Sequence, residues 1–129
     1  MIDHLEKNKR FAVIFTFLIA IEIFVISAIP GGKLSKTSFD LSHLYHMIVF
    51  FLLNFFFILS ISQKKKVTFK YIALSIIFSL SYAILDEIHQ IFIPYRFPSL
   101  TDVFVDFTGV LLSIIVYLYY KKTPQSLKI

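Results

Sequence analysis

Cysteine is missing from this chain of 129 residues, and glycine and proline are scarce, with three and four residues respectively. Without cysteine, disulfide bonds and thiol chemistry are excluded. So little glycine and proline leaves little material for loops, and most of the chain is therefore expected to be regular structure. Charged residues make up only 16% of the sequence and hydrophobic residues 57%, and the mean hydropathy is +0.79. This composition lies outside the usual range of soluble domains and indicates a membrane protein.

Several common functional motifs are also missing. The sequence has no glycine-rich phosphate-binding loop, no serine nucleophile elbow and no internal repeat, which argues against nucleotide-dependent and hydrolase functions. It has no HExxH motif or similar set of metal ligands either. Acidic and histidine residues at helical spacing could still hold a divalent cation, but we assign no cofactor and no metal site.

The apolar residues fall into four nearly unbroken runs of about twenty residues, which is the length that a helix needs to cross a bilayer. Strands would instead show strict alternation of apolar and polar residues. Pro30, Pro94 and Pro98 help to end the first and third runs, because proline cannot continue a helix. The sequence predicts an all-α fold, an antiparallel bundle of four transmembrane helices within a single domain, 1–129. The predicted helices cover residues 11–29, 44–62, 69–93 and 101–120.

The basic residues are distributed unevenly around these runs. Ten of the thirteen Lys and Arg residues lie before the first run, between the second run and the start of the third, where Lys70 is included, or after the fourth. Short loops rich in Lys and Arg stay in the cytoplasm. We therefore expect a multi-pass protein of the plasma membrane with both termini in the cytoplasm. The net charge of +5 reports this topology and gives no reason to invoke nucleic acid. The sequence leaves the oligomeric state open.

Polar residues form stripes on the predicted helices, which should face protein and not lipid. The third run carries Ser75, Ser79, Tyr82, Asp86, His89 and Gln90, and the fourth carries Asp102, Asp106, Gly109, Ser113 and Tyr117. On the second run, His43, Met47, Phe50 and Asn54 share a face. Gly109 could let a neighbouring backbone approach closely. Because the helices alternate in direction, these stripes should meet around one outward-opening cavity, with Arg96 at its rim.

Some polar residues also have structural explanations. Asp102 follows Ser99 by three residues, the spacing of a helix capping box, so its carboxyl group could instead bind free backbone N–H groups. We interpret His46, near the start of a helix, as an interfacial side chain. Glu22 is expected to be neutral and hydrogen-bonded within the bundle. Glu87 lies off the stripe of its helix and could face another helix or water.

Residues 81–109, SYAILDEIHQIFIPYRFPSLTDVFVDFTG, resemble the signature of the VanZ-like family of small membrane proteins. The acidic-x-x-Gln element of that family corresponds to Glu87-Ile88-His89-Gln90 together with the preceding Asp86. Downstream, the resemblance continues at the residues Pro94, Arg96, Asp102, Asp106 and Gly109. Upstream, it includes Ser27 and Pro30 at the end of the first helix and Asp40 with His43 before the second. The resemblance covers nearly the whole chain.

The resemblance implies a polytopic membrane protein, and the member that gives the family its name raises resistance to the glycopeptide teicoplanin. We expect a binding factor whose outer polar site engages a lipid head group or a lipid-linked envelope precursor. The first alternative is a membrane enzyme acting on such a head group, with Glu87, His89 and Asp86 as catalytic residues. The second is a structural or assembly subunit. The expected ligand-binding residues are Arg96, Gln90, Asp40, His43, Asp102 and Asp106.

Overall fold

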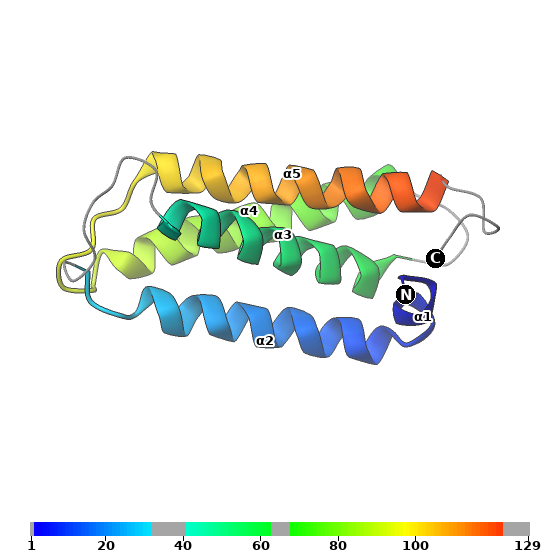
Figure 1. Ribbon diagram of the computed structural model, residues 1–129, viewed down its shortest axis with the longest axis horizontal. Helices are drawn as coiled ribbons and strands as arrows, with labels where there is room; N and C mark the ends of the chain where they lie inside the picture. Colours follow the sequence, from blue (N-terminus) through cyan, green and yellow to red (C-terminus); the bar gives the residue numbers. More distant parts are fainter. Residues whose placement is uncertain (1, 32–40, 63–67, 123–129) are drawn as a thin grey trace.

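The computed structural model describes residues 2–31, 41–62 and 68–122 of the chain, and most of these residues are helical (Figure 1). A short helix, α1, is followed by four long ones. Their bounds are α1 Ile2–Lys7, α2 Lys9–Ser27, α3 Leu41–Ile61, α4 Phe69–Gln90 and α5 Leu100–Lys122. The four long helices are each long and apolar enough to cross a membrane.

The four long helices lie side by side as an antiparallel bundle (Figure 1). Helices α2 and α4 run in one direction, and α3 and α5 run in the other. This arrangement confirms the predicted all-α fold class. Many large apolar side chains on the outer surface remain exposed, including Phe17, Ile77 and Ile115. Such a surface suits hydrocarbon, because a soluble protein would not expose so many apolar side chains together.

The helices overlap the four predicted runs, but their ends differ by up to three residues. Helix α3 begins three residues earlier than expected, at Leu41, and α4 ends three residues earlier, at Gln90, whereas the sequence favoured 69–93. The amides of Ile91, Phe92 and Ile93 bond to the carbonyl three residues back, so the chain tightens into a turn there. Pro94 follows directly, and the residue before a proline disfavours α-helical geometry. The α-helix therefore ends about one turn earlier than its apolar pattern suggests.

Helix α3 lies at the centre of the bundle, in contact with α2, α4 and α5. One apolar cluster contains Ile23, Phe50, Leu53 and Val110, and a second contains Ala12, Ile58, Leu59 and Tyr117. A polar connection also joins three helices in the interior. Ser79 of α4 donates to Asn54 Oδ1 at 2.9 Å, and Asn54 Nδ2 donates to Ser113 Oγ of α5 at 2.7 Å. These bonds confirm that the polar stripes face protein.

The two ends of the bundle differ in chemistry. Among the described residues, Lys9 and Arg10 begin α2, Lys70 lies near the start of α4, and Lys121 and Lys122 end α5, all at the same end of the bundle (Figure 1). At the opposite end, α2 and α4 finish while α3 and α5 begin. The candidate site lies at this second end.

Candidate functional site

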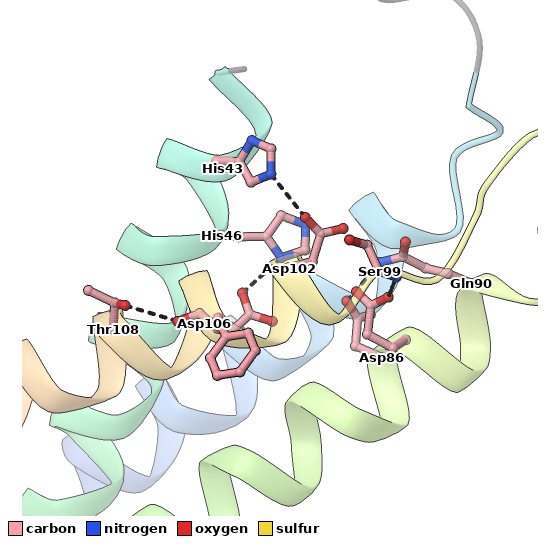
Figure 2. Close-up of polar contacts among 10 residues, drawn as sticks. His43, His46, Asp86, Gln90, Ser99, Asp102, Asp106 and Thr108 are labelled. Carbon is pink, nitrogen blue, oxygen red and sulfur yellow. Dashed lines mark hydrogen bonds and ion pairs between the residues drawn. The ribbon is translucent and has the colours of Figure 1, made fainter. Parts of the chain in front are cut away.

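A group of acidic, histidine and amide side chains lies where α3 and α5 begin and α4 ends (Figure 2). We call this group the polar cluster. Its members are His43 and His46 of α3, Asp86, Glu87 and Gln90 of α4, and Asp102 and Asp106 of α5. Three separate helices therefore contribute, as the sequence predicted for the second, third and fourth transmembrane runs.

Two histidine–aspartate pairs join α3 to α5 (Figure 2). His43 Nε2 lies 3.2 Å from Asp102 Oδ1, and His46 Nδ1 lies 3.0 Å from Asp106 Oδ1. The two helices run in the same direction, so the second pair lies one turn deeper than the first. The outer pair is partly exposed, whereas Asp106 is 0% and His46 6% exposed. The cluster thus extends from a partly exposed pair to a buried one.

Gly109 explains how α3 and α5 come close enough to form these pairs. A Cβ atom built on Gly109 would lie 2.2 Å from the backbone oxygen of Met47. Real side chains do not approach that closely, so any other residue would force the helices apart. The expected close approach at Gly109 is therefore confirmed, and it places the two helices in contact one turn below the buried pair.

The two carboxyl groups of α4 accept hydrogen bonds from groups at and just after the C-terminal end of this helix. Gln90 Nε2 donates to Asp86 Oδ2 at 3.1 Å. The backbone N–H of Ser99, in the connection before α5, donates to Glu87 Oε2 at 2.7 Å. Both carboxyl groups are buried. Figure 2 shows Asp86, Gln90 and Ser99 next to the histidine–aspartate pairs.

Two carboxyl oxygens in the cluster have no hydrogen-bond partner among the described residues. They are Glu87 Oε1 and Asp106 Oδ2, and both are buried from solvent. Buried polar atoms are normally hydrogen-bonded, because an unsatisfied group loses its interactions with water without compensation. Each atom is thus an acceptor that a proton or a bound ligand could satisfy.

His89, an expected catalytic residue, turns toward α2 instead of toward α3 and α5. Its ring stacks on Phe24 with centroids 4.4 Å apart, and its Nδ1 lies 3.2 Å from Ser27 Oγ. Of the polar residues of α4 that were expected to face α3 and α5, Asp86 does so and His89 does not. Asp40, the remaining expected ligand, lies outside the described residues, and the outward-opening cavity stays a prediction.

The Arg96 side chain donates hydrogen bonds to backbone carbonyl groups at the end of α2. Its Nε donates to Ile29 O at 2.9 Å and its Nη2 donates to Ile26 O at 3.4 Å, so it caps the carbonyl end of α2. The adjoining turn packs tightly, because a Cβ on Gly31 would lie 2.2 Å from Tyr95 O. Tyr95 itself has a φ of 59°, a left-handed conformation that follows Pro94. Arg96 therefore fixes the connection after α4 against α2.

His46 shows where the interpretation from sequence was wrong. We expected an interfacial side chain, but His46 is buried and bonded to Asp106. The signal was present in the sequence, because His43, His46 and Phe50 follow one another at spacings of three and four residues. That spacing places His46 on the same buried stripe. Its position near a helix start was a poorer guide than its angular position.

Glu22 and Asp102 also differ from the structural explanations offered for them. Glu22 is exposed on α2, so the expectation of a bonded group within the bundle was wrong. The Asp102 carboxyl group pairs with His43, whereas the Ser99 hydroxyl accepts the N–H of Thr101 at 3.2 Å. Ser99 thus serves the free amides at the start of α5, and the Asp102 side chain is directed to the neighbouring helix.

Four long apolar helices and a buried acid–histidine cluster at one end define a small multi-pass membrane protein. The family model described as VanZ/LLP1 matches residues 5–121, and the chain belongs to this family. Neither the curated proteins nor the solved structures gave a match.

Proposed function

We propose that the polar cluster binds the head group of a membrane lipid or of a lipid-linked envelope precursor. The observation that carries the proposal is the set of buried, interacting acids and histidines contributed by α3, α4 and α5. Ionisable side chains within membrane helices are costly and usually serve a function. Head groups lie at the membrane surface, so a site formed by three helices near one end of the bundle could reach them.

We propose further that this end faces outward and that both termini lie in the cytoplasm of a plasma-membrane protein. The described basic residues at the ends of α2, α4 and α5 support this orientation, because such residues stay on the cytoplasmic side. Lipid-linked precursors of the cell wall are exposed at the outer face of that membrane. An outward site could therefore engage them where glycopeptides act.

Lipid extraction tests head-group binding directly. The full chain is purified in a mild detergent, and the lipids that remain bound are extracted and quantified by mass spectrometry. The wild type should retain a defined lipid class, and Asp102→Asn should retain much less of it. Glu22→Gln is the matched control, because it also removes one acid, from an exposed position outside the cluster. Equal retention by all three proteins would contradict the proposal.

Resistance to teicoplanin is the physiological consequence that the family suggests. A susceptible host producing the wild type should grow at a higher teicoplanin concentration than the same host producing Asp102→Asn. The Glu22→Gln protein should behave as the wild type at equal membrane abundance. If the wild type gives no resistance but still retains lipid, the binding proposal stands without this role.

Acid–base catalysis on a head group is the second candidate, and the His46–Asp106 pair favours it. When Asp106 is ionised its carboxylate only accepts hydrogen bonds, so that in this state His46 Nδ1 donates to Asp106 and Nε2 is the nitrogen left to take up a proton. This is how a carboxylate orients a general base. Incubation with total lipid, followed by mass spectrometry, should then reveal a modified head group with wild type and none with His46→Gln. Retention of lipid without any modification would favour binding alone.

A further inference from the structure

We infer that the ligand of the polar cluster carries a primary ammonium group, which donates N–H bonds to the acids of α4 and α5. This inference rests on the proposed function, since it names the chemistry of the head group that the same site takes. It follows from the charge of the cluster, from its unsatisfied carboxyl oxygens and from the hydrogen bonds that its donors already make.

The charge of the cluster is unbalanced. It contains four carboxyl groups, those of Asp86, Glu87, Asp102 and Asp106, and two imidazoles. With all four carboxyl groups ionised and both histidines protonated, the acids are in excess by two. Uncompensated charge is strongly disfavoured in a medium of low dielectric constant. A cation is therefore the ligand that such a site accommodates best.

The unsatisfied atoms point in the same direction. Glu87 Oε1 and Asp106 Oδ2 have no partner among the described residues, and their residues are 7% and 0% exposed. Figure 2 shows the Asp106 carboxyl group beside the ring of His46. Both atoms are acceptors, so the group that satisfies them must bring hydrogen-bond donors.

Several donors of the cluster already bind its acids. Gln90 donates to Asp86, the Ser99 amide donates to Glu87, and His46 pairs with Asp106. Arg96, which the sequence suggested as a phosphate ligand, donates to the carbonyls of Ile29 and Ile26. The unsatisfied carboxyl oxygens therefore suit an N–H donor better than a phosphate oxygen, which could meet only the second ring nitrogens of the histidines.

An ammonium group also suits the spacing of the acids better than a metal ion does. A metal needs several ligands converging on one point at short distance. Within residues 2–31, 41–62 and 68–122, no three acidic or histidine side chains come together closely enough for this. An ammonium carries three separate donors, so it does not need ligands that converge on one point.

Competition in native mass spectrometry tests the inference on the full-length protein in detergent. The probes are dioleoyl phosphatidylethanolamine, phosphatidylcholine and phosphatidylglycerol, which share their tails. Choline has the positive charge of ethanolamine but no N–H donor, so the difference in binding between these two lipids measures the contribution of the N–H bonds. We expect ethanolamine lipid to bind at least roughly tenfold more tightly than either of the others, the usual effect of bonds to a charged group.

Variants of single residues test whether the preference for the ethanolamine lipid depends on the polar cluster. Asp106→Asn and Glu87→Gln each remove one negative charge with almost no change of shape, and each should reduce the ethanolamine preference to less than about threefold, because half or more of the effect depends on charge. Glu22→Gln, outside the cluster, should keep the full preference. Circular dichroism checks that each variant has the helix content of the wild type.

The outcomes separate this inference from the proposed function. Tighter binding of phosphatidylglycerol would overturn the ammonium inference and leave head-group binding intact. Stabilisation by Mg²⁺ or Ca²⁺ in place of an amine would also overturn it. If free ethanolamine binds and no lipid does, the ammonium chemistry is correct and the lipid head group is the wrong source. If none of the probes binds, the ammonium inference fails, and the lipid-extraction experiment decides the proposed function separately.

Discussion

At the scale of single residues, the buried pair of His46 and Asp106 has the largest expected effect on stability. Each partner compensates the other in a place with no access to water, since Asp106 is 0% exposed. Removing one partner leaves a buried polar group uncompensated, whereas removing both removes the need for compensation. The two cases can be distinguished by a double-mutant cycle.

The first prediction is that His46→Leu lowers the free energy of unfolding by about 3 kcal/mol, the usual effect of breaking a buried pair. The double variant His46→Leu with Asp106→Leu should recover most of this loss. Unfolding in SDS titrations, followed by circular dichroism, measures both. Additive losses in the double variant would show that the two side chains do not depend on each other.

The second prediction concerns Glu87, which accepts the backbone N–H of Ser99. Glu87→Ala should speed hydrogen exchange at the Ser99 amide roughly tenfold, because a bond to a charged acceptor is lost. Glu87→Gln keeps an acceptor oxygen and should exchange nearly as slowly as the wild type. Equal exchange in all three proteins would mean that Glu87 does not hold the connection before α5.

At the scale of helices, the contact between α3 and α5 depends on the absence of a side chain at Gly109. Alanine normally stabilises a helix relative to glycine by roughly 0.5–1 kcal/mol. Here the added Cβ would overlap the backbone oxygen of Met47. The local preference and the packing therefore act in opposite directions, and the overlap with a rigid backbone should dominate.

The third prediction is that Gly109→Ala destabilises the protein by about 1–3 kcal/mol, as overpacking does. It should also weaken lipid retention, because α5 carries Asp102 and Asp106. Thr108→Ala is the neighbouring control, since Thr108 is exposed. Thermal unfolding followed by the helical signal at 222 nm compares the two. A more stable Gly109→Ala protein would contradict the packing described for α3 and α5.

Helical periodicity made the polar stripes predictable, because residues three and four apart share a face whatever the rest of the fold. Ser79, Asp106 and Ser113 were placed correctly for this reason. The bonds of Arg96 and Glu87 were not predictable, because they depend on the path of the connection between α4 and α5. Glu22 was misjudged because α2 is apolar on almost every face, so its sequence does not show which face packs.

At the scale of the whole molecule, the separation of basic and acidic ends predicts the orientation in the membrane. Cysteine introduced at the exposed Phe97 should react with a membrane-impermeant maleimide in intact cells, and cysteine at the exposed Lys122 should react only after lysis. The chain has no native cysteine, so the unmodified protein is a clean control. Labelling of Lys122→Cys in intact cells would reverse the topology.

The same orientation places the polar cluster at the outer surface, where it would meet head groups. Photochemical crosslinking of the unmodified chain tests this most directly. A phospholipid with a diazirine next to its phosphate is incorporated with the protein into vesicles, and crosslinked residues are identified by peptide mass spectrometry. Crosslinks should concentrate in 43–46, 86–90 and 99–106, and Asp102→Asn should reduce them. Crosslinks spread evenly over the exposed faces of all four helices, and unchanged by Asp102→Asn, would contradict a head-group site.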